Sequence, residues 1–258
     1  MKYVKFDMHT HNSDGSVDAH ISAQDSINVL KAKGFGGMLI SDHDSYDGYE
    51  AVDFSEVTDF TVLKGIEYDT SDFGHFLVIL PDGVDVKVLN YRGLKLEKLI
   101  YIVHKYGGVL GAAHPCGETF LSYYDTGIRH GHYYKMMQYI AFIDFFEGYN
   151  ASEDTWRNVL ACKVAKKYNI PVTGGSDAHK EDCLGLGYTY LPDYIKTNTD
   201  FIRYIKKKPH NKIGGRQYGK TTKDKLGPFN KLLVAGFYFY NKFEALINLP
   251  FRIIYRED

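Results

Sequence analysis

The stretch Tyr3-Val-Lys-Phe-Asp-Met-His-Thr-His11 opens the chain and decides how the rest of it is interpreted. Tyr3–Met8 is typical of a short β-strand, and His9 and His11 follow directly at its end. Side chains two residues apart on an extended backbone point to the same face, so both imidazoles are expected on one side of this strand. The sequence therefore predicts a strand that ends in a group of candidate ligands.

Beyond this strand, β-like runs alternate with helical segments, which indicates an α/β fold with a parallel sheet wrapped by helices. The predicted strands are Tyr3–Met8, Gly37–Ile40, Thr61–Ile66, Phe76–Leu80, Val109–Ala113, Phe142–Phe146 and Pro171–Thr173, and the predicted helices are Ser22–Lys33, Leu94–Tyr106 and Trp156–Lys167. Residues 115–137 are rich in Tyr and His and receive no assignment.

The pattern changes near residue 206, where Lys206-Lys207-Lys208-Pro209 begins a basic stretch. We therefore predict a catalytic barrel over residues 1–205 and a basic and aromatic extension over residues 206–258. The aromatic and aliphatic residues after Phe229 recur at near-helical spacing, which favours packing on the barrel or on a partner over lying on a membrane. Pairing of two copies of the chain through this extension is one such arrangement.

Composition sets the broad class of the protein. The chain has 258 residues and a formal net charge of −1, so general attraction to nucleic acid or membrane is not expected. Its three cysteines are far apart, which argues against a disulfide framework. The N-terminus lacks the apolar run of a signal peptide. These features predict a cytoplasmic enzyme.

Side chains of metal-binding type recur where the predicted strands end or begin. The carboxyl ends of barrel strands meet at one rim, so such residues can converge although they are far apart in sequence. Imidazole and carboxylate are ligands that Zn²⁺, Mn²⁺ and Fe²⁺ accept, and a bridging carboxylate can hold two cations close together. The candidate ligands are His9, His11, Asp14, Asp42, His43, Asp44, Glu67, His75, His114, Asp177 and His179.

Each of these residues taken alone has an ordinary structural explanation. A single histidine on a strand is more often a packed core or surface residue, and Asp14, Asp42 and Asp44 are equally suited to cap a helix. The recurrence of ligand types at five separate strand ends is what favours a shared metal site.

The motifs resemble those of the PHP (polymerase and histidinol phosphatase) superfamily and occur in that family's order, from the start of the chain to about Lys180. They are Asp7-Met-His-Thr-His11 with Asp14-Gly15, Ser41-Asp-His-Asp44, Gly65-Ile-Glu67, His75, Ala113-His114-Pro115 and Gly175-Ser-Asp-Ala-His179. The resemblance implies a distorted (β/α)7 barrel with its metal site at the carboxyl ends of the strands. It also implies two or three divalent ions (Zn, Mn or Fe) and hydrolysis of phosphoesters.

The resemblance further implies how the ligands are shared among three metal sites. The implied sets are His9, His11, Glu67 and Asp177 for the first ion, Glu67, His75 and His114 for the second, and Asp14, His43 and His179 for the third. The spacing of these residues indicates only that they can meet.

The expected chemistry is hydrolysis by a metal-bound hydroxide, because a divalent ion lowers the pKa of its bound water from about 15.7 to about 7. A small phosphorylated metabolite or a nucleotide is the expected substrate, and the basic stretch Arg203–Lys225 also suits a short oligonucleotide. Arg129 and Arg216 are candidates to bind phosphate, because the guanidinium offers a planar fork of donors. An exposed surface role is as well supported for both.

Three further residues are candidates for catalysis or support. His130 and His132 imitate the first His-x-His pair but follow no clear strand, and Glu147 follows a predicted strand where barrel strands present functional groups. Two other functions remain open: an amidohydrolase-like metal hydrolase, and a non-catalytic domain that keeps metals for regulation. A complete ligand set argues against the last, since a structural domain has no evident need for an open multi-metal site.

Overall fold

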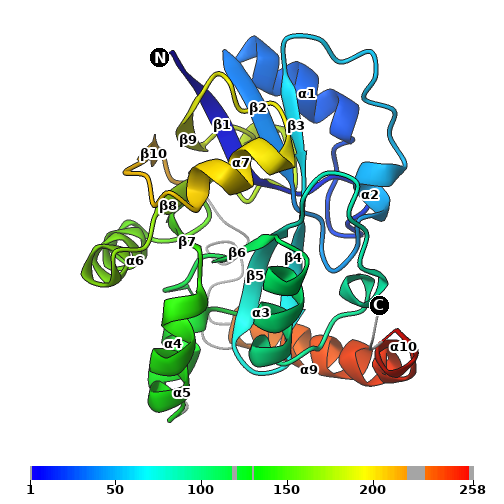
Figure 1. The fold of residues 1–258 in the computed structure, drawn as a ribbon, viewed down its shortest axis with the longest axis vertical. Helices are drawn as coiled ribbons and strands as arrows, with labels where there is room; N and C mark the ends of the chain where they lie inside the picture. The colour runs from blue at the N-terminus through cyan, green and yellow to red at the C-terminus, as the bar shows by residue number, and fades with distance from the viewer. Residues whose placement is uncertain (1, 118–120, 130, 220–229, 256–258) are drawn as a thin grey trace.

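The computed structural model describes residues 2–117, 121–129, 131–219 and 230–255 and shows a mixed α/β fold (Figure 1). Its strands form two five-stranded sheets, ordered β10-β9-β1-β2-β3 and β4-β5-β6-β7-β8. The first contains β1 (Tyr3–Thr10), β2 (Phe35–Ile40), β3 (Thr61–Lys64), β9 (Gly187–Pro192) and β10 (Lys212–Gly215). The second contains β4 (Ile66–Thr70), β5 (Gly74–Ile79), β6 (Val109–Ala112), β7 (Phe145–Asn150) and β8 (Val172–Gly175).

Among the described residues, isolated bridges join the two sheets, between Thr10 and Ala178 on one side and between His43 and Glu67 on the other. No continuous ladder closes the sheets into a barrel within the part of the chain that the structure describes. The strands also mix directions, since β4 and β5 form an antiparallel hairpin and β9 runs antiparallel to β1. The expected α/β class is confirmed, whereas the distorted (β/α)7 barrel is not. The strands divide between two sheets, and the chain passes from the first to the second at Gly65, between β3 and β4.

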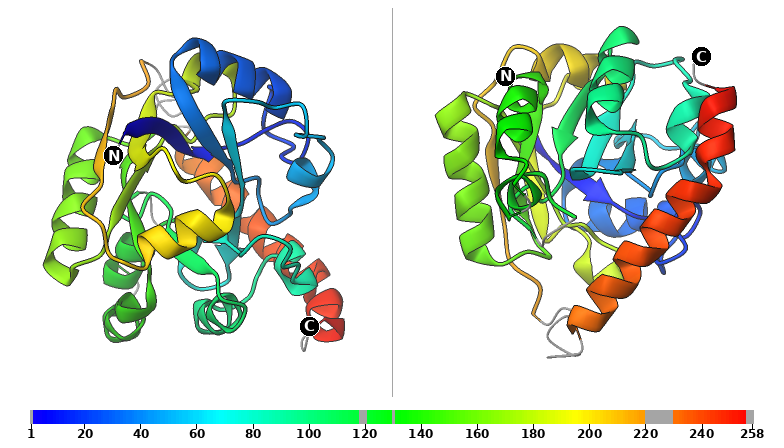
Figure 2. Two further views of the ribbon diagram at one scale, coloured as in Figure 1. Left: turned by 45° about the horizontal axis from the view of Figure 1, so that its top comes forward. Right: turned by 90° about the horizontal axis from the view of Figure 1, so that it is seen from below.

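The helices cover the outer faces of the sheets, as two further views show (Figure 2). The longer ones are α1 (Ala23–Ala32), α3 (Leu96–Lys105), α6 (Thr155–Tyr168) and α7 (Asn198–Ile205), and the shorter ones are α2 (Asp47–Glu50), α4 (Tyr123–Arg129) and α5 (Tyr133–Tyr139). Short 3-10 turns lie at Lys87–Asn90, Ile140–Phe142 and Glu181–Cys183. Ser22 and Thr197 begin α1 and α7, each with a hydroxyl that accepts a backbone N–H three residues on.

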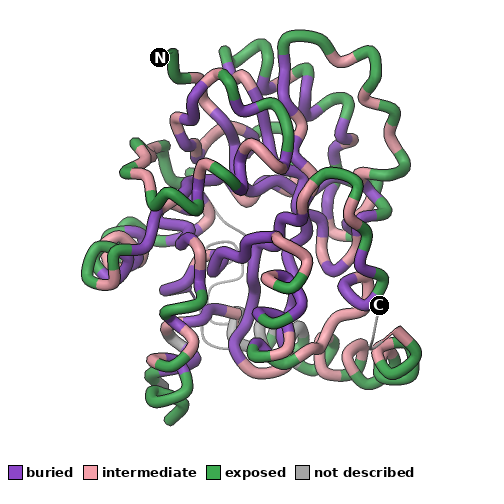
Figure 3. The backbone as a smooth tube through the Cα atoms, viewed as in Figure 1, coloured by how far each residue is buried: buried purple, intermediate pink, exposed green. Residues whose placement is uncertain are grey.

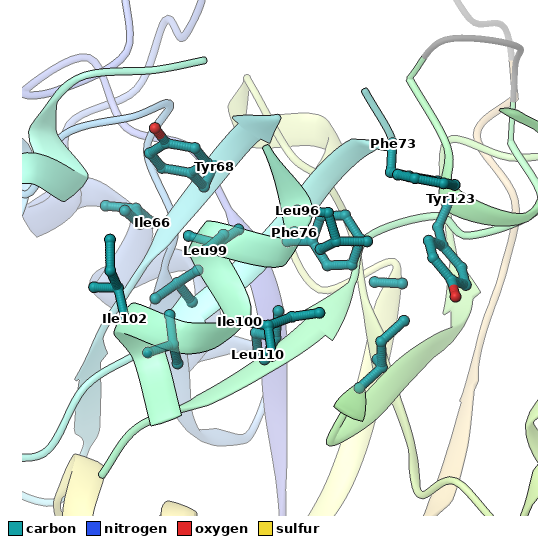
Figure 4. Close-up of a cluster of buried hydrophobic side chains, with 14 of the residues drawn as sticks. Ile66, Tyr68, Phe73, Phe76, Leu96, Leu99, Ile100, Ile102, Leu110 and Tyr123 are labelled. Carbon is teal, nitrogen blue, oxygen red and sulfur yellow. The ribbon is translucent and has the colours of Figure 1, made fainter. Parts of the chain in front are cut away.

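Apolar side chains fill the space between the two sheets at one end. Phe6 of β1, Leu77 of β5 and Phe145 of β7 pack together there, and Phe201 and Ile205 of α7 close that end. A second apolar layer lies between α3 and the outer face of the β4–β8 sheet (Figure 4). The chain is therefore buried most deeply along its strands (Figure 3). Polar ligand-type residues are left at the opposite ends of β1 and β8.

Several predicted elements differ from those observed. The strand predicted at Phe142–Phe146 is β7 at Phe145–Asn150, because Phe142 lies in a 3-10 turn and is 53% exposed. The predicted strand Thr61–Ile66 ends at Lys64, since β4 starts a new sheet after Gly65. The sequence analysis did not predict β9 and β10, which belong to the first sheet, or α7. The unassigned region 115–137 holds α4 and part of α5.

The C-terminal residues form α9 (Asn230–Ile247) and α10 (Leu249–Ile254), which lie against the β4–β5 side (orange and red in Figures 1 and 2). The Arg92 guanidinium donates to Asn241 over 2.7 Å, and the ring of Tyr91 stacks on Phe251 with centroids 5.0 Å apart. The outward side of these helices exposes apolar side chains at Leu232, Phe239, Phe243, Leu246, Ile253 and Ile254. No described helix is long and apolar enough to cross a membrane. Residues 212–215 belong to the first sheet rather than to this helical part.

The end of β8 approaches β1 closely at Gly175, because glycine has no side chain there. A Cβ at Gly175 would lie 2.4 Å from the His9 Cβ and 2.6 Å from the His9 backbone nitrogen. Gly175→Ala should therefore lower the free energy of unfolding by about 1–3 kcal/mol, measured as a reduced midpoint in thermal or urea unfolding. Gly236→Ala in α9, where nothing lies within 4 Å of the new methyl, is the control and should not destabilise the protein. An unchanged midpoint for Gly175→Ala would contradict the packing described here.

Candidate metal centre

His9 and His11 lie at the end of β1 and are fully buried. Asp7, two residues earlier, fixes this strand end against the residues after β8: its carboxylate accepts hydrogen bonds from the Ser176 backbone nitrogen (2.8 Å) and from Gly185 (2.9 Å). Burial raises the pKa of Asp7 to about 6, opposed by the hydrogen bonds from Ser176. The same contacts place Asp177 beside the two histidines.

The first group of donor atoms comes from His9, His11, Glu67 and Asp177. The two Nε2 atoms lie 3.1 Å apart, and Glu67 Oε2 is 3.4 Å from each of them. Asp177 Oδ1 is 3.6 Å from His9 and 3.4 Å from His11. Four ligands bound at 2.0–2.1 Å in a tetrahedron are separated by about 3.3–3.4 Å, so these atoms are spaced to hold one cation such as Zn²⁺.

The second group shares Glu67 with the first. Its other oxygen, Oε1, lies 3.1 Å from His75 Nδ1 and 2.9 Å from His114 Nε2. One buried carboxylate therefore faces two sets of imidazoles, one with each oxygen. This is the arrangement expected of a carboxylate that bridges two cations.

A third group of imidazoles comes from His11, His43 and His179. The ring of His11 stacks on those of His179 and His43, with centroids 4.2 and 4.5 Å apart. Asp18 completes this side of the site: its Oδ2 lies 3.3 Å from His179 Nε2 and 3.7 Å from His43 Nε2.

Asp14, which the resemblance assigned to this third set, is placed differently. Its carboxylate accepts the Ala23 backbone N–H over 2.7 Å, at the start of α1, and it belongs to none of the three donor groups found among the described residues. Asp14 and Asp18 lie in the same loop, four residues apart, and the fold of that loop decides which carboxylate faces the histidines. The sequence analysis missed Asp18, whose only signal was its position in an Asp-rich loop after His11.

Glu147 holds two of the histidines in position. Its Oε1 lies 3.0 Å from His9 Nδ1, and its Oε2 accepts the His114 backbone N–H over 2.7 Å. Asn150 donates to Glu147 Oε2 and to Asp177 Oδ2. Such partners fix the ring orientation and tautomer of a ligating histidine and leave Nε2 to face the centre. Glu147 therefore contacts the ligands rather than the central space.

Backbone strain is concentrated at the same place. His114 and Asp177 have φ values of 28° and 54°, in the left-handed region that residues other than glycine rarely adopt. Each such conformation costs on the order of 1 kcal/mol and persists only where the surrounding structure enforces it. Here it turns two candidate ligands toward the central carboxylate.

Buried carboxylates and imidazoles lie next to one another in this site and shift each other's pKa values. Burial alone would raise the pKa of Glu67, but the neighbouring His75 and His9 hold it well below its usual value. Burial opposes charge on His9 as well, yet Glu147 and Asp177 keep its pKa raised. Burial and the charge of His11 lower the pKa of His43 to about 3, which leaves its ring nitrogens neutral. Divalent cations are bound by ionised carboxylates and by imidazoles that are neutral or that release a proton when the metal binds. The donor set of this site therefore fits divalent cations.

The remaining candidates are dispersed. Arg129 ends α4, but its side chain lies outside the described residues, as does all of His130. His132 precedes α5 and lines a pocket near Asp69. Arg216 is exposed after β10, where its backbone N–H donates to Leu186. Tyr218, which the sequence analysis did not select, donates its hydroxyl to the carbonyls of Ser176 and Asp177.

The PHP-associated family model matches residues 155–208, which span α6, β8, β9 and α7. No curated protein matches the sequence at a significant level.

Solved structures with the same fold include PsfC from Pseudomonas syringae PB-5123, with 16% identity, a TM-score of 0.58, and coverage of 94% of this chain and 99% of that one. A two-domain protein from Bacteroides vulgatus, containing a predicted PHP-like metal-dependent phosphoesterase, has 15% identity and a TM-score of 0.55 over 83% of this chain and 65% of that one. The lesion-specific endonuclease EndoQ from Pyrococcus furiosus has 18% identity and a TM-score of 0.58 over 82% of this chain and 58% of that one.

The positions of Asp18 and Asp14 lead to a test of the third group. Asp18→Ala should reduce the amount of metal bound per chain, measured by elemental analysis after dialysis, because it removes the carboxylate between His43 and His179. Asp14→Ala should instead lower the free energy of unfolding by about 1 kcal/mol and leave the metal content near that of the parent, since it removes a hydrogen bond to the start of α1. Loss of metal in Asp14→Ala but not in Asp18→Ala would instead identify Asp14 as the ligand.

Proposed function

We propose that this chain is a member of the PHP superfamily and a metal-dependent hydrolase of phosphoesters. The observation that supports this most directly is the position of Glu67, with one carboxylate oxygen toward His9 and His11 and the other toward His75 and His114. A cluster that only stabilised the fold would need one closed set of ligands, whereas these sets adjoin in one site.

The grouping of donor atoms supports an assignment of the residues that would hold the cations. His9, His11, Glu67 and Asp177 suit the first, Glu67, His75 and His114 the second, and His43, His179 and Asp18 a third. When bound, divalent cations would supply hydroxide at neutral pH and neutralise charge on the phosphoryl oxygens.

Neighbouring side chains orient the candidate metal ligands. Glu147 fixes the ring of His9 through Nδ1, and it also holds the backbone of His114. Asn150 and Ser152 donate to Asp177 Oδ2, so that Oδ1 remains directed at the histidines. The low exposure of these groups keeps their hydrogen bonds strong and their geometry fixed before a substrate arrives.

The expected substrates are phosphorylated metabolites or nucleotides. A phosphodiester in a nucleic acid is a second candidate, because the solved neighbour EndoQ is a lesion-specific endonuclease.

Removing a ligand should test the proposal. His9→Ala and Asp177→Ala should each lower bound metal and reduce phosphate release by more than about 100-fold, because each removes a donor from the first group. His210→Ala, at an exposed histidine outside the site, is the matched control and should behave as the parent. Phosphate release would be followed over nucleotides, sugar phosphates and histidinol phosphate with Mn²⁺, Zn²⁺ or Fe²⁺ added. Unchanged release in either ligand variant would contradict the assignment.

Glu147→Gln should reduce phosphate release less than the two ligand substitutions do. The amide keeps the shape of the carboxylate but weakens its contact with His9, so we expect a loss of about 10- to 100-fold in metal affinity or turnover with little change in folding. The measurement is a metal titration followed by the phosphate-release assay. A parent protein that releases no phosphate with any of the three metals but cleaves an amide panel would favour the amidohydrolase alternative instead.

A further inference from the structure

A pocket lies beside the proposed metal centre, between the β4–β5 hairpin and the C-terminal helix α9. Its volume is about 210 Å³. Ligand pockets for drug-sized molecules are larger, about 300–1,000 Å³, so this one suits a single small group such as a sugar ring. Polar side chains in its lining come from Asp69, Ser71, Asp72, His132, Asn241 and Lys242.

Asp69 connects this pocket to the metal centre. It lies opposite His75 in the β4–β5 pairing, and its Oδ1 is 3.8 Å from His75 Nε2. The other ring nitrogen of His75 is 3.1 Å from Glu67. The pocket therefore begins one side chain away from the carboxylate that both donor groups share, within reach of the part of a substrate that extends from its phosphate.

Asp69 is also a buried acceptor in the wall of the pocket. It is only 8% exposed, and its backbone N–H donates to Asp44. A buried carboxylate is costly unless donors satisfy it. A hydroxyl group that enters the pocket would supply a donor to it.

The remaining lining groups define the chemistry of a ligand. Asp69 and Asp72 contribute two carboxylates, and Lys242 contributes one ammonium, which donates to the Ser71 carbonyl over 2.5 Å. Two carboxylates against one ammonium disfavour a second phosphate in this pocket. Hydroxyl, amide and imidazole groups from Ser71, Asn241 and His132 surround them, which suits a neutral partner with several hydroxyls.

The position of α9 is coupled to the site by a chain of contacts. Asp44 pairs with Arg92 over 2.9 Å, and Arg92 donates to Asn241 over 2.7 Å. The other oxygen of Asp44 accepts the Asp69 backbone N–H over 2.7 Å. The same buried carboxylate thus orders β4 and, through Arg92, the helix that forms the opposite wall of the pocket.

We propose that this pocket binds the alcohol part of the phosphoester, and that this part is a neutral polyhydroxyl group such as a sugar or the ribose of a nucleotide. Lys242 and Asn241 of α9, together with Asp72, are then specificity-determining residues. The inference rests on the proposed phosphoesterase function and assigns to the C-terminal helix a role in choosing the substrate.

The test compares two substrates on the metal-loaded full chain: a sugar phosphate or nucleoside monophosphate, and phenyl phosphate, whose leaving group carries no further hydroxyl. In the parent, kcat/KM should be higher for the hydroxylated substrate. Lys242→Met should lower the ratio of the two kcat/KM values by about 10- to 100-fold, mainly through KM, because a hydrogen bond from a charged group contributes that much to binding. Leu246→Ala, on the exposed side of α9, is the control and should keep the parental ratio.

Asp72→Asn tests the other wall without relying on α9. The amide oxygen can still accept the Leu96 N–H that Asp72 Oδ1 accepts over 2.9 Å, so folding should be retained and checked by the unfolding midpoint. The ratio for the hydroxylated substrate should fall here as well. Equal losses on both substrates in Lys242→Met and Asp72→Asn, or a parental preference for a bisphosphate or for phenyl phosphate, would overturn the inference while leaving the phosphoesterase proposal standing. No phosphate release from any substrate by the parent would overturn both.

Discussion

The carboxylate of Glu67 is the interaction on which the rest of the site depends. It is almost fully buried, and it lies within 3.4 Å of His9 and His11 and within 3.1 Å of His75 and His114. A buried carboxylate is stable only when it is paired and hydrogen-bonded. Strands from both sheets must therefore end at this one group, and the His43–Glu67 bridge joins the sheets at the same residue.

This constraint explains the irregular architecture. A closed barrel of regular parallel strands would give each strand one end at the rim, but here β4 and β5 form a hairpin that brings Glu67 and His75 together from antiparallel neighbours. His114 and Asp177 reach the centre through left-handed backbone conformations. The apolar layer closed by α7 at the other end supplies stability that offsets this local strain.

The C-terminal helices extend the same network outward. Arg92 links Asp44, next to the candidate ligand His43, to Asn241 of α9. The helix is thus fixed by polar contacts on its inner side, while its outer side keeps an exposed apolar surface over residues such as Phe239 and Leu246. Pairing of two chains through that surface stays a prediction.

The sequence alone determined the ligand types and the approximate positions of the strands that carry them. Period-two spacing put His9 and His11 on one face of the first strand, because such a local signal does not depend on distant contacts. The grouping of these residues with Glu67 and Asp177 was implied by the resemblance. The choice of Asp18 over Asp14 beside the histidines, the β4–β5 hairpin and the pocket under α9 were decided only by tertiary structure. Each depends on how a loop or helix packs against residues far away in sequence, and no local periodicity records that.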